Sequence, residues 1–545
     1  MKRTPPIPAG PPLPGPTETG SRIPVQWALL VGLLCLFTIA AVVVSNGNPA
    51  VALAPCLIAV LVGLVWVLPL RVPMLTLLAL SWTLEIAGDA FASNLVQTPL
   101  RVVGTLLFAK LNLSIPVDAL VVSGFDLLLL LFGVVIVYRH STRSRIDRIG
   151  WVEAPRPIWQ FAVLALVAIA WMTIFGMARG GSFRFALWQI TKHLYLPLVY
   201  LLMAEALRGP ADAVVVGRVV LGAGIFRSVE AMILRRMFPS TDIFPHAVTH
   251  HDSVLFATCV AILLAMLLER PTRRALRICA LLLPIFLGGM IANHRRLAWT
   301  ELAAVAAFFF LITPLGRFKR FVLRSLVVSI VPLLIYGAVG WNSQQRLYGP
   351  VRMFRSLFDA NVDSSTRWRD FENYDLVVTF SKSPLLGSGF GHPFIEELKL
   401  PDITKDYELE PYIPHNSVLG LWAFGGLVGF ALLWAIYPVG MFFTVRAYRS
   451  SRTRIERITA LGAAAVQICY VMQGYGDLGF GTWGPVFTLA TAYALVGKIC
   501  VANGAWPARF SRARVVDPPR VQDPAGIPPP ATLPFPRARP GTYEG

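Results

Sequence analysis

PHNSVLGLWAFGGLVGFALLWAIYPVGMFF, residues 414–443, is the stretch of this chain that decides its fold class. After a short polar start it is apolar, and it is long enough to cross a hydrocarbon core of about 30 Å as a helix. The residues that precede it, 341–414, are polar and carry four arginines, Arg352, Arg355, Arg367 and Arg369. Because polar groups held among membrane spans usually mark a functional site, we look for the function in this loop.

The composition of the whole chain is that of a membrane protein. Of its 545 residues, 55% are hydrophobic and 14% are charged, whereas roughly a quarter of the residues of a soluble globular protein are charged. The mean hydropathy is +0.61. We therefore expect an all-α integral membrane protein with one large extracytoplasmic loop between two late helices.

Apolar stretches that fit a membrane-spanning helix recur along the sequence, and we count about fourteen of them. They predict spans at 25–44, 50–69, 73–92, 119–138, 159–176, 190–206, 213–231, 252–268, 278–293, 297–313, 325–340, 415–443, 458–475 and 483–501. The third span contains Glu85 and Asp89, and the seventh contains Arg218 and Arg227. Because a charge at the centre of a helix costs about 3 kcal/mol on insertion scales, these two are the weakest, and the prediction is about 12–14 transmembrane helices.

The net charge of +19 has a topological explanation. Short clusters of Lys and Arg follow four of the predicted spans, at 139–148, 270–277, 317–324 and 446–457. All four clusters lie on the same side of the predicted membrane, as the positive-inside rule requires of cytoplasmic loops. This pattern needs no nucleic-acid partner, and it places both termini in the cytoplasm and the 341–414 loop outside it.

The chain therefore divides into five predicted segments. Residues 1–24 and 502–545 are proline-rich tails, which we expect to be disordered and cytoplasmic. Residues 25–340 form a membrane domain of about eleven helices, and residues 415–501 supply the last three. Residues 341–414 form the extracytoplasmic loop that carries the site.

Several kinds of chemistry have little support in the sequence. No P-loop and no GxGxxG motif occurs, so nucleotide hydrolysis is not indicated. The six cysteines lie in or beside apolar spans without a CxxC pair, so we expect buried thiols rather than disulfides or thiolate metal sites. His246, His250, His251 and Asp252 have spacing that suits a metal, but we predict no metal and no cofactor.

Four motifs give the chain a resemblance to a known family. They are STR at 365–367, SPLLGSGFG at 383–391, PHNSVL at 414–419 and FGGLVG at 424–429. In order and spacing they resemble the O-antigen ligase and polymerase family. RGGSFR at 179–184 looks like that family's Gly-Gly stretch, and NHRR at 293–296 stands in the place of its Ser-x-Ser-Arg turn, although no serine precedes Arg295 or Arg296 here. The resemblance covers about residues 280–440 well and residues 160–280 loosely.

The resemblance implies a multi-spanning glycosyltransferase of the bacterial cytoplasmic membrane that needs neither metal nor nucleotide. Its donor would be an oligosaccharide linked to a polyprenyl diphosphate such as undecaprenyl diphosphate, used at the outer face. An acceptor glycan hydroxyl would attack the anomeric carbon, and the lipid diphosphate would leave with inversion. Membrane lipid, and a chain-length regulator or other polysaccharide assembly protein, are the remaining expected partners.

The extracytoplasmic arginines suit this reaction. A diphosphate is a better leaving group when guanidinium groups meet its developing charge, because they hold phosphate bidentately and stay protonated. The candidates on the outer side are Arg179, Arg184, Arg295, Arg296 and Arg367. Contacts with lipid headgroups or loop carboxylates are the alternative explanation for each of them.

His415 is the candidate general base. It lies at the start of a predicted span, after Pro414, and a free imidazole has a pKa near 6.5, which suits removal of a proton from a sugar hydroxyl. Capping or packing at the helix start is the alternative, and the family match favours the base. Asn416 would orient the imidazole or cap the helix. Asp477 and His250 are the other supporting candidates.

Two further features leave alternatives open. The three glycines within 384–391 either cradle a phosphate through backbone amides or pack a tight turn, and packing is favoured. Glu85 and Asp89 suggest a second class of function, a lipid-linked oligosaccharide flippase or transporter, but transporters place polar residues at the membrane midplane. Within the enzyme class we favour a repeat-unit polymerase over a ligase that transfers finished glycan.

Overall fold

The protein is helical in the computed structural model. The structure describes residues 25–44, 49–84, 103–104, 107–108, 110, 121–142, 150–238, 246–343, 345–355, 364–399, 409, 411–476 and 479–508. Every named element within them is a helix, and the β-structure described there is one isolated bridge between Lys110 and Ser123. The prediction of an all-α membrane protein is confirmed.

The helices follow the apolar stretches of the sequence closely. In chain order they are α1 (Val25–Val44), α2 (Pro49–Val67), α3 (Arg71–Thr83), α5 (Gly124–Ser141), α6 (Arg156–Ala178), α7 (Phe183–Ala206), η2 (Pro210–Asp212), α8 (Ala213–Met237), α9 (Asp252–Glu269), α10 (Arg273–Asn293), α11 (Arg296–Ile312), α12 (Arg317–Gly340), η3 (Arg346–Tyr348), α13 (Gly349–Arg355), α14 (Ser364–Lys382), α15 (Ser417–Trp434), α16 (Ile436–Ser450), α17 (Arg454–Gly476) and α18 (Trp483–Ala502).

Eight helices of the described part are long and apolar enough to cross a membrane. One of them combines α15 and α16 into a continuous stretch of 34 residues, which corresponds to the predicted span at 415–443. The pair formed by α7 and α8, bent by 101°, is a ninth candidate. The predicted number of spans is larger for three reasons. Helices α3 and α11, with 13 and 17 residues, are shorter than the roughly 20 residues that a span usually needs. Helices α7 and α8 were predicted as two spans and form one bent pair, and α1 and α2 are not among the eight.

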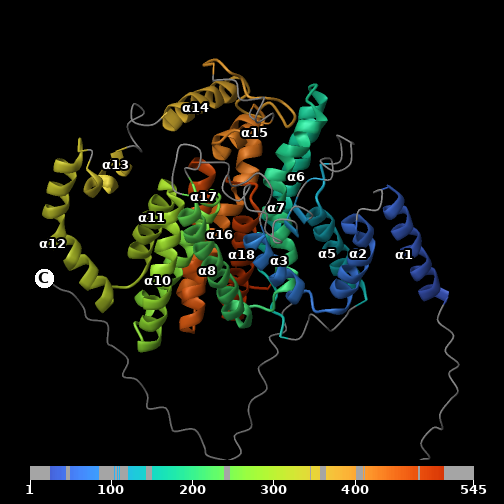
Figure 1. Cartoon of the computed structure of the whole chain (residues 1–545), viewed down its shortest axis with the longest axis horizontal. Coiled ribbons are helices and arrows are strands. Elements are labelled where there is room, and N and C mark those ends of the chain that lie inside the picture. Colours follow the sequence, from blue (N-terminus) through green and yellow to red (C-terminus); the bar gives the residue numbers. More distant parts are fainter. Residues whose placement is uncertain are drawn as a thin grey trace, which may run out of the picture.

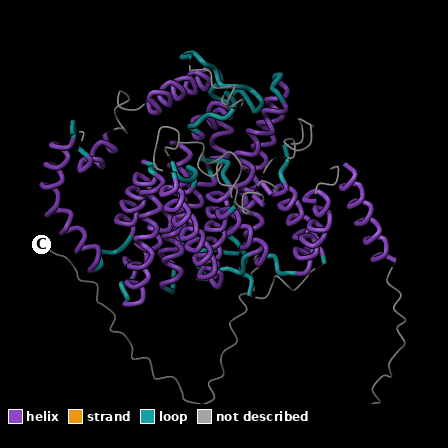
Figure 2. The backbone as a smooth tube through the Cα atoms, viewed as in Figure 1, coloured by secondary structure: helices purple, strands orange, loops and turns teal. Residues whose placement is uncertain are grey.

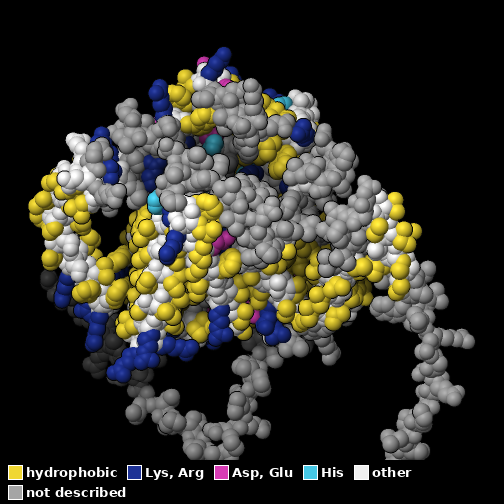
Figure 3. Space-filling model, in the orientation of Figure 1, with side chains coloured by type: hydrophobic (Ala, Val, Ile, Leu, Met, Phe, Trp, Pro, Cys, Tyr) yellow, Lys and Arg dark blue, Asp and Glu magenta, His cyan; other side chains and the backbone are white. Residues whose placement is uncertain are grey.

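The long helices stand side by side, and α16 continues below α15 (Figure 1). Helix α14 lies across one end of this array, above α15, and the connecting segments gather at the two ends (Figure 2). Hydrophobic side chains cover the sides of the helices, whereas Lys and Arg side chains collect along the end opposite α14 (Figure 3). We call these the α14 end and the basic end. Helices α8, α10, α12 and α17 begin at the basic end.

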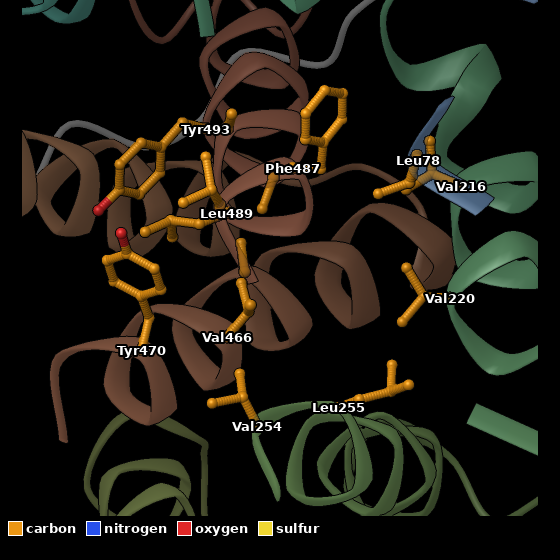
Figure 4. Packing of buried hydrophobic residues seen from close by; sticks show 14 of the residues in the cluster. Leu78, Val216, Val220, Val254, Leu255, Val466, Tyr470, Phe487, Leu489 and Tyr493 are labelled. Carbon is orange, nitrogen blue, oxygen red and sulfur yellow. The ribbon is translucent and has the colours of Figure 1, made fainter. Parts of the chain in front are cut away.

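The core is built around α18, whose membrane-spanning window is 89% buried inside the protein. Figure 4 shows side chains of four helices pointing toward one another around it. They are Phe487, Leu489 and Tyr493 of α18, Val466 and Tyr470 of α17, Val254 and Leu255 of α9, and Val216 and Val220 of α8. This packed centre fixes the positions of the helix ends, and the candidate site residues lie at those ends.

A buried ion pair involves α8, which corresponds to one of the two weakest predicted spans. Arg227 of α8 donates two hydrogen bonds to the carboxylate of Asp252, both at 2.8 Å, and a third to Glu230 at 2.6 Å. Arg227 and Asp252 are both buried. A buried arginine is tolerated when its charge is paired and its donors are satisfied. The pair links α8 to the start of α9 and so helps to position the loop between them.

The polar loop contains a helix that its hydropathy conceals. Helix α14 packs against α15 along a stripe of buried or half-buried residues, Trp368, Glu372, Asp375, Leu376 and Thr379. Their spacing is that of one helix face. Because the stripe mixes carboxylates with apolar groups, it gives no amphipathic signal. The sequence analysis therefore predicted residues 341–414 to be a loop.

Candidate functional site

The candidate base His415 is held by a carboxylate of α14. Glu372 Oε1 accepts a hydrogen bond from the backbone N–H of His415 at 2.9 Å and lies 3.2 Å from its Nδ1. Glu372 is fully buried, while the His415 side chain is 27% exposed. An imidazole that donates from Nδ1 to this carboxylate carries its proton there and has a lone pair on Nε2. A histidine with an oriented, unprotonated nitrogen and a partly open side chain is suited to take a proton from a bound hydroxyl.

Asn416 anchors the same segment. Its Oδ1 accepts the backbone N–H of Leu419 at 3.0 Å, which makes it the N-cap of α15, and its Nδ2 donates to Asn373 Oδ1 at 2.9 Å. The side chain is buried. Asn416 therefore caps the helix and ties it to α14, so that Glu372 and His415 are held by two adjacent side-chain contacts between the same elements.

The glycine-rich turn at 383–391 is a packing element. Its backbone N–H groups at Ser388, Gly389 and Phe390 donate to the carbonyl oxygens of Ala423, Phe424 and Met172, at 2.9 to 3.3 Å. The N–H of Gly391 donates to Gln189 Oε1 at 2.6 Å. Because these amides have partners within the protein, the structure supports the packing role over a phosphate cradle.

Glycine is required where this turn meets α15. Gly426 interrupts α15 with φ +58°, and a Cβ there would lie 2.4 Å from the backbone nitrogen of Gly387. Gly387 has φ +68°, and its own Cβ would lie 2.3 Å from the carbonyl oxygen of Phe424. The two backbones thus approach more closely than any side chain permits. The contact positions the N-terminal half of α15, which carries His415 and Asn416 at its start.

Gln189 of α7 joins the remaining segments of this region, and the sequence analysis missed it. Besides accepting from Gly391, it donates from Nε2 to the carbonyl oxygens of His392 at 3.3 Å and Tyr412 at 3.0 Å. Tyr412 in turn stacks on Phe185, with ring centroids 3.8 Å apart. The available signal was an amide side chain directly before the predicted span 190–206, because such a group needs hydrogen-bond partners when it is buried, as Gln189 is.

Three of the candidate arginines lie on exposed positions around this segment. Arg179 ends α6 and donates to the carbonyl oxygen of Gly387 at 3.1 Å, so it also braces the glycine turn. Arg184, in the first turn of α7, lies over the ring of Phe185, with 5.7 Å from Cζ to the ring centroid. Arg367 of α14 lies over Phe371 at 5.4 Å. Their guanidinium groups are carried by different elements at the α14 end.

A second basic group lies at the ends of α8, α9, α10 and α11. Nη2 of Arg295, the residue before α11, lies 3.5 Å from Nε2 of His250. Arg235 of α8 donates to the carbonyl oxygen of Ala292 at 2.8 Å and so lies at the same helix ends. Arg296 is the first residue of α11. The structure thus brings two of the candidates, Arg295 and His250, into contact, and it adds Arg235, which the sequence analysis missed.

The histidines of this group are influenced by its arginines. Burial, together with the charges of Arg295, His250 and Arg235, lowers the pKa of His246 to about 3, so His246 is neutral at physiological pH. Burial and Arg235 also lower the pKa of His294, which ends α10 with φ +55°. The arginines therefore supply positive charge to the group, and they disfavour protonation of His246 and His294.

The histidine cluster does not form a metal site with Asp252. Both carboxylate oxygens of Asp252 accept hydrogen bonds from Arg227, and one accepts from the backbone N–H of Thr249 as well. Within the described residues, no group of three or more His, Cys, Asp or Glu side chains could hold a metal. Asp252 instead holds α8 and α9 together.

A small hollow lies behind Pro414, on the side of α7. It encloses about 320 Å³ of empty space open to solvent and is lined by Gln189, Lys192, His193, Ile413 and Leu421, among others. Lys192 and His193 also line a neighbouring hollow of about 310 Å³. Lys192 was missed although it stood within the predicted span 190–206, where a cation is itself a signal of function. The hollow brings a cation close to the His415 segment.

Some of the candidates lie outside the described residues. These are Asp477 and the pair Glu85 and Asp89. All six cysteines are described, and all are free thiols.

Comparison with known proteins bears on the same residues. Residues 281–434 match the family model described as O-antigen ligase. A search of curated proteins finds no match. The matched segment runs from α10 to α15 and contains Arg295, Arg367, Glu372 and His415. The match covers nearly the same residues as the resemblance over about 280–440 and agrees with it.

Proposed function

We propose, from the O-antigen ligase match over residues 281–434, that this protein is a membrane glycosyltransferase and acts as a repeat-unit polymerase. It would join a polyprenyl diphosphate-linked oligosaccharide to an acceptor glycan at the outer face of the cytoplasmic membrane. The observation that carries the proposal is the contact between Glu372 and His415 at the start of α15. It provides an oriented base within the matched segment, on the side of the molecule opposite the basic end.

The reaction uses the two kinds of group that the α14 end offers. Nε2 of His415 takes the proton of an acceptor hydroxyl as the oxygen forms a bond to the anomeric carbon of the donor. The bond from that carbon to the diphosphate oxygen breaks, and its electron pair leaves with the lipid diphosphate. Glu372 stabilises the imidazolium that forms, because a carboxylate beside a protonated imidazole lowers the free energy of the charge pair. Attack from the face opposite the leaving group inverts the anomeric configuration.

The leaving diphosphate gains negative charge, and arginines are the residues that meet it. Arg367 is exposed on the same helix as Glu372, and its guanidinium lies over the ring of Phe371. Of the two adjacent candidates at the start of α11, Arg295 is favoured, because it lies beside His250. Guanidinium groups hold phosphate oxygens bidentately without a metal ion. The proposed diphosphate site therefore consists of Arg367 and Arg295, with Arg179, Arg184 and Arg296 around it.

The membrane topology of the proposal follows the charge distribution. Lys and Arg side chains gather at the basic end (Figure 3), and the positive-inside rule assigns such clusters to the cytoplasm. The α14 end would then face outward, both tails would be cytoplasmic, and residues 341–414 would form the outer site. A partner that regulates chain length would act at the same outer face.

One incubation tests the proposal. Purified protein is mixed with a synthetic undecaprenyl diphosphate-linked oligosaccharide, with chelator and without nucleotide, and the lipid-linked products are resolved by size. A ladder of lengthening chains is the expected result and identifies a polymerase. Extension only after a different acceptor is added would identify a ligase, and no turnover with any acceptor would contradict the enzyme.

Variants assign the roles within that assay. His415→Ala and Arg367→Ala are expected to abolish product at equal protein level in the membrane. His140→Ala is the matched control, because His140 is an exposed histidine in the last turn of α5 and lies outside the proposed site. Normal product from His415→Ala would overturn the assignment of the base.

A further inference from the structure

A large cavity lies away from the proposed catalytic site, at the basic end. It has a volume of about 490 Å³, is partly open to solvent, and lies between α8, α9, α10, α17 and α18. Its lining residues come from the first turns of α8, α10 and α17 and from the middle of α9 and α18. These helix starts belong to the basic end, so the opening of the cavity is on the side opposite His415.

The walls of the cavity are apolar and its opening is basic. Valine, leucine, isoleucine, alanine and glycine dominate the lining, as Val216, Val220 and Val466 illustrate (Figure 4). The opening carries two exposed arginines, Arg218 of α8 and Arg274 of α10. An apolar interior below a rim of positive charge fits a molecule with apolar chains and an anionic head.

The positive charge at the opening is not neutralised by its acidic neighbours. Asp212 pairs with Arg71 at 2.9 Å, and Glu269 pairs with Arg457 at 2.9 Å. Among the described residues, Arg218 and Arg274 form no hydrogen bond or ion pair. These two guanidinium groups are therefore available to a ligand.

A third arginine holds the rim in place. Nη2 of Arg454, the first residue of α17, donates to the carbonyl oxygens of Met266 at 2.7 Å and Arg270 at 2.6 Å. These bonds fix the start of α17 against the end of α9. The N-termini of α10 and α17 both line the cavity, and the partial positive charge of helix N-termini adds to the attraction for an anion.

We propose that this cavity binds an anionic diacyl phospholipid of the leaflet at the basic end, with its acyl chains between α8, α9 and α17 and its phosphate at Arg218 and Arg274. The site is distinct from the proposed lipid-linked donor site, which lies at the other end of the helices. Its occupant fills a gap in the helix array that the described side chains leave open. It stabilises the packing of α8 against α17.

A glycine of the wall allows the cavity to be filled without disturbing the fold. Gly217 lines the cavity, and no heavy atom lies within 4 Å of the position that a Cβ would take there. Gly217→Leu therefore places a side chain in the space proposed for the acyl chains. Gly222→Leu is the matched control, since Gly222 lies on the same helix with equally open surroundings and does not line the cavity.

The test measures lipid bound to the purified full-length protein by native mass spectrometry after delipidation. The probes are phosphatidylglycerol, phosphatidylcholine with the same chains, diacylglycerol and inorganic phosphate. We expect phosphatidylglycerol to bind most tightly. Gly217→Leu should abolish its binding, whereas Gly222→Leu should leave it unchanged. Arg218→Gln and Arg274→Gln should each weaken it about fivefold, because one basic residue near an anionic lipid contributes about this factor, and Arg277→Gln, outside the cavity lining, should not.

Three results would overturn the proposal. They are equal affinity for phosphatidylglycerol and phosphatidylcholine, phosphatidylglycerol binding that survives Gly217→Leu, and binding of inorganic phosphate as tight as that of the lipid. Thermal unfolding of each variant in detergent shows that it remains folded, so that a loss of lipid reports on the site.

Discussion

Replacing Glu372 by Gln tests the reasoning about the base most directly. The substitution keeps the size of the side chain and one acceptor oxygen for the backbone N–H of His415, which lies 2.9 Å from Oε1. It removes the negative charge that faces Nδ1 at 3.2 Å. We therefore expect α14 to remain packed against α15, while the imidazole loses its charged partner.

The size of the effect follows from that one contact. A hydrogen bond to a charged group contributes about 1.5 to 3 kcal/mol. The contact strengthens when the imidazole becomes charged in the transition state. Glu372→Gln therefore raises the free energy of the transition state more than that of the ground state. A loss of about 2 to 3 kcal/mol lowers kcat about 30- to 150-fold. Because the Glu372 side chain is fully buried and does not reach a ligand, KM should stay unchanged.

The assay is the rate of chain extension by purified protein as a function of donor concentration and pH. Without the carboxylate a lower pH is needed to protonate His415, so the acid limb of the rate profile should move to lower pH. Asp375→Asn is the control. Asp375 is a buried carboxylate on the same helix, and it accepts the N–H groups of Glu397 and Leu398 at 3.0 Å each. Its loss should lower the melting temperature without moving the acid limb.

The reasoning is refuted if Glu372→Gln retains more than a third of the wild-type kcat while His415→Ala is inactive. A rise in KM at constant kcat would also contradict it, because that pattern belongs to a residue that binds substrate in the ground state.

Three other predictions follow from the same region. Arg295→Ala should reduce glycan transfer strongly and Arg296→Ala only mildly, since Arg295 contacts His250, and two mild phenotypes would remove this turn from the diphosphate site. Gly426→Ala should lower both the melting temperature in detergent and the activity, because a left-handed alanine costs about 1–2 kcal/mol and its Cβ would displace Gly387, whereas Gly133→Ala, in open surroundings, should do neither. Chelator should leave the rate of chain extension unchanged, and loss of activity that added Mg²⁺ restores would contradict stabilisation of the leaving group by arginines alone.

The elements that the sequence predicted well are those whose signal is local. An apolar stretch long enough to span the membrane forms a helix, because without water its backbone N–H and C=O groups must hydrogen-bond to one another. The ends of α9, α10 and α18 accordingly lie within about two turns of the ends of the predicted spans. The position of His415 and Asn416 at the start of α15 was predicted for the same reason, because the apolar run begins directly after them.

The site was predicted in part, and the missing residues share a physical property. Glu372 and Gln189 act through partners that lie 43 and more than 200 residues away along the chain, so no local pattern relates them to His415 or to the glycine turn. The contact between Arg295 and His250 is of the same kind. No local sequence pattern shows which of these residues are in contact in the folded protein.

The resemblance to a known family indicated His415 as the candidate base, whereas composition and periodicity alone determined that this chain is a helical membrane protein and which end of its helices is basic. These properties depend on how each segment partitions between water and lipid, and every residue contributes to that partition independently of the others. The tertiary structure decided that the polar loop contains α14, that the glycine turn packs on α15, and that Glu372 orients His415. Such features depend on pairwise contacts between distant segments, and these are fixed only when the helices have packed around α18.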